Sequence, residues 1–152
     1  MRFEFSLEGL LRVRESFEKQ EEQRLAIATG ELKRLNTMLE TVREQLISVS
    51  DRLDKTLARG TLGADLHLLY FERFALQRRE LALNEYVASA QAKMQDQQAR
   101  LQEATQKRKT LDNLRQKQLE LFLITEGHRD QQKLDDAFLL RRSNDSSGKD
   151  AA

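Results

Sequence analysis

The sequence predicts an all-α fold, a long antiparallel coiled-coil hairpin made of two helices. The chain has no Pro and only six Gly among its 152 residues, so little in it interrupts long helices. Two stripes of apolar residues recur with alternating steps of three and four, and a glycine-containing turn separates them. Charged residues make up 34% of the chain, which suits helices that bury only a narrow stripe.

The first stripe predicts helix one over about residues 6–58. Ser6 is the expected N-cap, and Glu8 lies in the first turn, where the helix dipole favours a carboxylate. The strongest part of the stripe consists of Leu25, Ala28, Leu32, Leu35, Leu39, Val42, Leu46, Val49, Leu53 and Thr56. The apolar face thins over residues 12–24. Within them, the charged residues Glu18, Lys19, Glu21 and Glu22 are predicted to be solvated, because charge runs on long helices are usually exposed.

A turn is expected at residues 59–65, where Gly60 and Gly63 supply the backbone angles of a C-cap and a tight connection. Asp65 is expected to cap helix two. Because a short loop between long helices implies antiparallel neighbours, residue i should lie near residue 122 − i. One helix has to cover the stripe of the other, and the hairpin provides that partner.

Helix two is expected over about residues 66–126. Its apolar register is Leu66, Leu69, Leu76, Leu83, Val87, Ala90, Met94, Leu101, Ala104 and Leu111. The same register includes the polar residues Arg73, Glu80, Gln97, Arg108, Arg115 and Gln118. Polar residues at such positions lower stability and fix the alignment of the helices.

The C-terminal part is expected to differ from the hairpin. Gly127 should interrupt helix two, a further helical segment should cover residues 128–142, and the polar residues 143–152 should form a disordered tail. Residues 1–142 are therefore predicted to be a single coiled-coil domain.

Composition argues against several classes of protein. The formal net charge is +1 and the charges are interspersed, which argues against binding of nucleic acid. No apolar run approaches the ~18 residues that a membrane span needs, and the N-terminal segment does not resemble a signal peptide. There is no Cys for a disulfide or a thiolate metal site. We expect a soluble, intracellular protein.

Motifs of catalysis are also missing from the sequence. It contains neither a phosphate-binding loop nor a dinucleotide fingerprint. His67 and His128 lack a second ligand at metal-binding spacing, so both are expected to be surface residues. A two-helix hairpin offers no concave pocket that would tune a carboxylate. We therefore expect no enzyme, no catalytic, metal or cofactor-binding residue, and no direct small-molecule ligand.

Apolar residues at the start of helix two exceed what the stripe requires. They include Tyr70, Phe71 and Phe74. These aromatic residues could pack across the turn against Leu53, Leu57 and Leu62. Their three positions span too wide an arc for all to do so, and we expect at least one to meet an outside partner.

A second apolar surface comprises Leu119, Leu121, Phe122, Leu123 and Ile124, near the point where helix one runs out. Two interpretations remain open. Phe3 and Phe5 could fold over Phe122 and complete a small core, or the surface could be an exposed patch for a partner.

Three segments carry a resemblance to a known family. They are FEFSLEGLLRVRE at 3–15, GTLGADLHLLYFERF at 60–74 and DQQKLDD at 130–136. In this order and spacing they resemble the start, the glycine turn with spaced aromatics, and the C-terminal motif of the FliJ family. That family belongs to the bacterial flagellar type III export apparatus, and the resemblance covers about residues 3–142.

The resemblance implies a stalk similar to the central stalk of rotary ATPases, without enzymatic activity. Its implied partners are the hexameric flagellar export ATPase, the cytoplasmic domain of the export gate, and export chaperones. It implies a cytoplasmic protein, peripherally associated with the inner face of the cell membrane at the flagellar base. Tyr70, Phe71 and Phe74 are expected to contact the gate. The residues expected to contact the ATPase ring are Leu119, Phe122, Leu123, Ile124, Leu134 and Phe138.

Two other interpretations stay open at the level of sequence. One is the equivalent stalk of a virulence type III secretion system. The other is a generic coiled-coil scaffold, in which helix one pairs with its copy in a homodimer. The hairpin predicts a monomer when the protein is alone.

Overall fold

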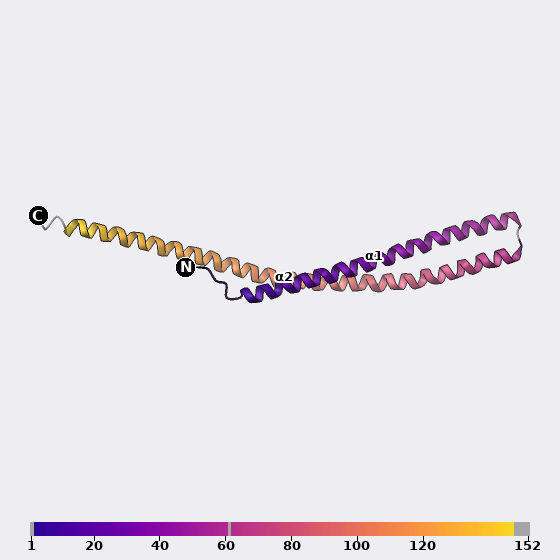
Figure 1. Cartoon of the computed structure of the whole chain (residues 1–152), viewed down its shortest axis with the longest axis horizontal. Coiled ribbons are helices and arrows are strands. Elements are labelled where there is room, and N and C mark those ends of the chain that lie inside the picture. The colour runs from indigo at the N-terminus through magenta and orange to yellow at the C-terminus, as the bar shows by residue number, and fades with distance from the viewer. Residues whose placement is uncertain (1, 61, 148–152) are drawn as a thin grey trace. The chain divides into compact units, whose positions relative to one another are not determined.

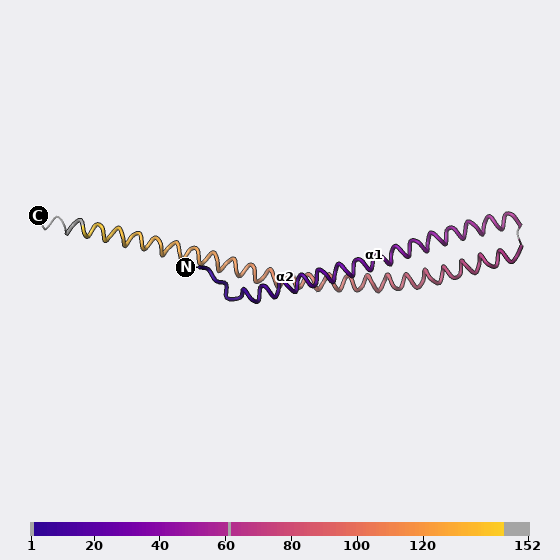
Figure 2. The backbone as a smooth tube through the Cα atoms, in the orientation of Figure 1, coloured from indigo at the N-terminus to yellow at the C-terminus, as the bar shows by residue number. Residues whose placement is uncertain are grey.

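The protein consists of two long helices in a computed structural model that describes residues 2–60 and 62–147, with side chains through residue 144. Helix α1 covers Glu8–Arg59 and helix α2 covers Gly63–Ser147 (Figure 1). The described residues contain no strand, which confirms the predicted all-α class. Figure 2 shows the chain reversing its direction between the two helices.

Contacts along the chain define two units, each described here by itself. Unit 1 comprises the described residues of Met1–Glu15 and Gln106–Ala152, and unit 2 comprises Ser16–Thr105. The expectation of one domain over residues 1–142 stays a prediction. In the described part of the chain, no helix is both long and apolar enough to cross a membrane.

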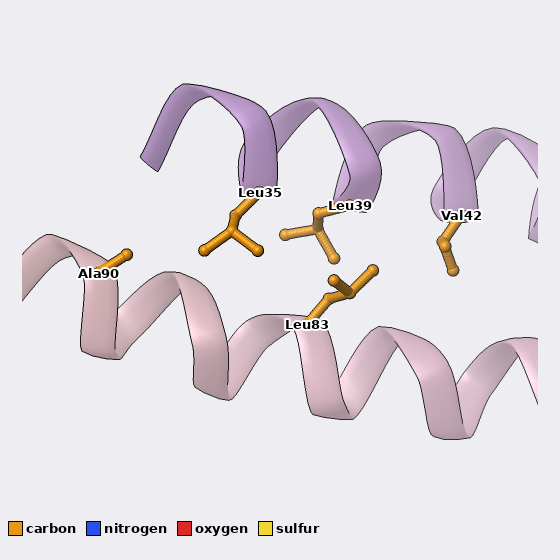
Figure 3. Close-up of a cluster of buried hydrophobic side chains, with 5 residues drawn as sticks. All are labelled: Leu35, Leu39, Val42, Leu83 and Ala90. Carbon is orange, nitrogen blue, oxygen red and sulfur yellow. The ribbon is translucent and has the colours of Figure 1, made fainter. Parts of the chain in front are cut away.

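The core of unit 2 lies along the seam, meaning the positions at which each helix faces the other. Its buried cluster is Leu35, Leu39, Val42, Leu83 and Ala90 (Figure 3). Every predicted stripe residue of α1 from Leu25 to Thr56 is buried or half-buried, as predicted. Each fully buried Leu or Val contributes about 1.5–3 kcal/mol relative to exposure, so this seam is the main stabilising feature of the unit.

Ion pairs across the seam show that the helices run antiparallel. Arg43 Nε lies 3.1 Å from Glu80 Oε1, and Arg52 Nη2 lies 2.8 Å from Glu72 Oε1. The predicted register places residue 43 near 79 and residue 52 near 70, within one or two positions of the observed partners. Long side chains that flank a seam reach diagonally, which accounts for the offset.

The polar residues of the second stripe were assigned correctly in most cases. Glu80, Gln97, Arg108 and Gln118 are half-buried on the seam side, as predicted. Arg73 and Arg115 are exposed instead. Next to Arg73, Glu72 is half-buried and pairs with Arg52. The long aliphatic stem of an arginine lets its guanidinium group reach water, which accounts for the exposure of Arg73 and Arg115.

Among the described residues of the turn, Gly60 lies in the left-handed region and Gly63 does not. Gly60 has φ = 66° and donates its N–H to the Leu57 carbonyl at 3.3 Å, which ends α1 as a glycine C-cap, as predicted. Helix α2 begins at Gly63, earlier than the predicted residue 66, so Asp65 lies in its first turn and is not a cap. A carboxylate there still interacts favourably with the helix dipole. Thr61, the expected centre of the turn, lies outside the described residues.

Helix α1 begins later than predicted, at Glu8. The Phe5 carbonyl accepts the Glu8 N–H at 3.1 Å, and the Leu7 carbonyl accepts the Leu11 N–H at 2.9 Å. These two bonds place Ser6 in a turn before the helix, so the first helical turn forms downstream of the predicted N-cap.

The expected break at Gly127 is wrong, because α2 continues through it to Ser147. A glycine in a helix interior costs about 1 kcal/mol but leaves the hydrogen-bond ladder intact. Residues 128–142 are helical, as predicted, but they belong to α2. Residues 143–147 of the predicted disordered tail are helical too, and residues 148–152 lie outside the described part of the chain.

Candidate interaction surfaces

Exposed aromatic residues cluster on the first turns of α2, in unit 2. Tyr70, Phe71 and Phe74 are all exposed, Phe71 to 67%. The Arg78 guanidinium carbon lies 6.0 Å from the centroid of the Phe74 ring, at the outer limit of a cation–π contact. About half or more of each aromatic side chain therefore stays accessible to another protein.

The three leucines near the turn leave these aromatic residues exposed. Leu53 is buried in the seam, whereas Leu57 and Leu62 are themselves exposed. Packing across the turn therefore leaves the aromatic surface open, together with exposed Leu68 on the same helix. An apolar surface of this kind is typical of a protein-binding site.

The second predicted surface, in unit 1, combines the two interpretations that the sequence left open. Phe3 packs against Phe122, with ring centroids 5.6 Å apart, and Phe5 is buried. The small core therefore forms. Leu121, Leu123 and Ile124 nevertheless stay exposed, and Leu119 is 37% exposed.

The rest of the described part of α2 carries unpacked apolar side chains. Every residue from Gly127 to Asn144 is exposed. Leu134 and Phe138 are 71% and 66% exposed, and their spacing of four places them on one face of the helix. These two residues are free to contact a partner without disturbing any core.

Unit 2 contains a groove of about 340 Å³ that the sequence did not predict. Small residues leave it open, because Ala28 of α1 lies near Ser89 and Ala90 of α2. Exposed Ile27 and Tyr86 line its sides. The pairing of alanines at facing stripe positions is the signal that could have predicted it.

Charged groups also border this groove. Glu31 accepts hydrogen bonds from Arg34 Nη2 at 2.7 Å and from Arg34 Nε at 3.1 Å. These hydrogen bonds hold the pKa of the exposed Glu31 carboxyl below its usual value. Glu31 and Arg34 form an exposed i, i+3 ion pair, so one edge of the groove carries an ionised carboxylate.

The prediction that Glu18 and Glu21 are solvated is wrong. Both are half-buried, and α2 supplies a hydrogen-bond donor to each. Lys19 and Glu22 are exposed, as predicted. Stepping back from Leu25 by four and then three residues reaches Glu21 and Glu18, and this spacing is the signal that the charge run concealed.

Chemical groups suited to metal binding do not gather in the described residues. No group of three or more His, Cys, Asp or Glu side chains there could hold a metal ion. His67 and His128 are both exposed.

Comparison with protein families gives one match. The family model described as "Flagellar FliJ protein" matches residues 3–147. Comparison with curated proteins found no match, and neither did comparison with solved structures. The family match spans nearly the whole chain and includes both helices. The chain therefore belongs to the flagellar FliJ protein family.

Proposed function

We propose that this protein is a non-enzymatic stalk that binds the hexameric flagellar export ATPase and links it to the export gate. Family membership carries the coarser part of this role, a component associated with flagellar type III protein export. The proposal further includes escort of export chaperones, which rests on the family alone. It places the protein in the cytoplasm, at the inner face of the cell membrane near the flagellar base.

The exposed apolar side chains on α2 are the observation that carries the proposal. The proposed ATPase-binding residues lie in unit 1: Leu119, Phe122, Leu123, Ile124, Leu134 and Phe138. Leu134 and Phe138 contribute nothing to an intramolecular core, so a partner is the simplest reason for two large apolar side chains there. Burial of each in a complex would contribute about 1.5–3 kcal/mol.

The proposed gate-binding residues are Tyr70, Phe71 and Phe74, in unit 2. Aromatic residues are common anchors at protein interfaces, because they bury a large area at a small cost in side-chain entropy. The two surfaces share no residue. Binding of the ATPase and of the gate can therefore be removed separately by mutation.

The experiment measures ATP hydrolysis by the purified export ATPase with the full chain and with a chain truncated after Glu126. This truncation removes Leu134 and Phe138 but retains the contact between Phe3 and Phe122. We expect the full chain to raise the turnover rate and the truncated chain to lose that effect. Circular dichroism serves as the control, since the remaining helices should keep their helicity and melting temperature.

Capture assays with the two proposed partners complete the test. The truncated chain should still bind the cytoplasmic domain of the export gate through Tyr70, Phe71 and Phe74. Full stimulation of the ATPase by the truncated chain would contradict the proposed ring-binding surface. If the full chain fails to bind the export ATPase or fails to bind the gate domain, the proposed linking function is contradicted.

A further inference from the structure

Within unit 2, the apolar part of the α1 seam stops at Leu25, but its spacing continues towards the N-terminus. Glu21 and Glu18 occupy the next two seam positions, and both are less exposed than the neighbouring Lys19 and Glu22. Only 15% of the Glu21 side chain is exposed. Two carboxylates therefore stand where a coiled coil usually places apolar residues.

Both carboxylates are satisfied by α2. The Gln97 amide Nε2 donates a hydrogen bond to the Glu21 carboxylate and a second, at 3.3 Å, to the Glu21 carbonyl oxygen. Thr105 Oγ1 donates to Glu18 Oε1 at 3.0 Å. Arg24 Nη1 adds a cation 3.1 Å from Glu21 Oε1. We call Glu18, Glu21, Gln97 and Thr105 the polar layer.

A second copy of α1 is the natural competitor for α2. The α1 stripe from Leu25 to Leu53 is apolar throughout, whereas the α2 register carries polar residues such as Glu80 and Gln97. A parallel pair of α1 helices would place each seam residue against its own copy, for example Leu39 against Leu39. On apolar contacts alone, α1 would therefore prefer its own copy to α2.

The polar layer changes this preference. In a parallel α1 pair, Glu21 would face Glu21 and Glu18 would face Glu18, and the donor from Gln97 would be absent. Like charges in a partly desolvated seam repel each other, and each carboxylate would lose the hydrogen bond that α2 donates to it. In the α1–α2 pair the same two carboxylates are paired with donors.

We propose that Glu18 and Glu21 determine partner choice: they commit α1 to α2 and prevent a parallel α1 pair with a second copy of the chain. Polar seam residues act in this way in coiled coils, where they select the partner at a cost in stability. The inference is independent of the proposed role in export, because it concerns only how the helices pair.

The test uses the full chain with Glu18→Leu and Glu21→Leu together. We expect this variant to form a dimer that increases with protein concentration in sedimentation velocity, while the wild-type chain stays monomeric. The chain has no Cys, so a single Thr56→Cys substitution can form a disulfide only between two chains. Position 56 lies in the seam, where the two introduced thiols of a parallel pair would meet. The disulfide is expected in the Leu variant and not in the wild-type background.

The matched control is Glu15→Leu with Glu22→Leu, which makes the same chemical change at two exposed positions of α1. It should remain monomeric and give no disulfide. If the seam variant does not fold, Glu18→Gln with Glu21→Gln keeps oxygen acceptors for Gln97 and Thr105 and removes the like-charge repulsion. This variant should also dimerise more than the wild type. Monomers at every concentration for the folded seam variants, or equal disulfide formation in the control, would overturn the proposal.

Discussion

Phe3 packs against Phe122, with ring centroids 5.6 Å apart and ring planes tilted by 53°. The contact joins the residues that precede α1 to the apolar part of α2. Phe5 and Leu11 are buried in the same unit, and Arg115 Nε lies 3.3 Å from Glu8 Oε2. The N-terminal residues therefore form a small core of their own in unit 1.

Phe3→Ala is expected to lower the free energy of unfolding by about 1–2 kcal/mol. The half-buried ring would lose part of its buried apolar area and the aromatic contact with Phe122. Urea unfolding followed by circular dichroism measures the change. Phe17→Ala, at an exposed position of α1, is the control and should change the value by about 0.5 kcal/mol or less. Equal losses in the two variants would show that the Phe3 contact does not stabilise unit 1.

Gly30→Ala is expected to raise the free energy of unfolding by about 0.5–1 kcal/mol. Gly30 lies inside α1, and a Cβ added there meets nothing within 4 Å, so alanine gains helix propensity without a clash. Thermal unfolding at one protein concentration measures the gain. Gly60→Ala is the matched comparison and should lower stability by about 1–2 kcal/mol, because Gly60 has φ = 66°. A loss of stability in Gly30→Ala would contradict the open surroundings of this residue.

Phe74→Ala is expected to weaken binding to the export-gate domain about tenfold, which is about 1.4 kcal/mol, while the melting temperature stays nearly constant. The ring is 57% exposed and its one aromatic interaction is with exposed Arg78. Isothermal titration calorimetry measures the affinity. Tyr86→Ala removes a similarly exposed aromatic ring from α2 and should leave the affinity unchanged. A large fall in melting temperature for Phe74→Ala would favour a structural role in the hairpin.

Leu134→Ser with Phe138→Ser is expected to abolish most of the stimulation of the export ATPase. Both side chains are exposed, so the variant should retain the helicity and melting temperature of the wild type. Steady-state ATP hydrolysis over a range of protein concentrations measures the effect. Ile27→Ser with Ile47→Ser removes two equally exposed apolar side chains from α1 and should stimulate as the wild type does. Identical behaviour of the two double variants would remove the reason to place the ATPase contact on α2.

Periodicity predicted most of the fold because a seam repeats the same physical requirement along its length. Every α1 stripe residue from Leu25 to Thr56 is buried or half-buried, and Gly60 ends the helix as expected. The two errors about α2, the expected break at Gly127 and the expected cap at Asp65, share a cause. Both predictions rested on local propensity, and the continuous hydrogen-bond ladder of α2 outweighed both local signals.

The candidate surfaces were predicted less completely than the fold. An excess of apolar residues identified Tyr70, Phe71 and Phe74 and the residues around Phe122, because exposed apolar side chains on a thin hairpin have few places to be buried. The groove beside Ala28 and Ala90 was missed, since a cavity depends on which small residues face each other. Pairing of that kind is invisible within one stripe alone.

The sequence by itself determined the helical class, most of the seam and the position of the turn, because each follows from local residue types and from spacing along one chain. The tertiary structure decided the antiparallel pairing of α1 with α2, which the sequence left open against a homodimer of helix one. Only the tertiary structure decided that Glu18 and Glu21 lie in the seam and that Phe3 covers Phe122. Whether a side chain is buried or solvated depends on the donors and surfaces that the other helix brings opposite it. A run of charged residues looks the same in the sequence whether it is buried or solvated. Here the donors Gln97 and Thr105 of α2 decide that Glu18 and Glu21 are half-buried.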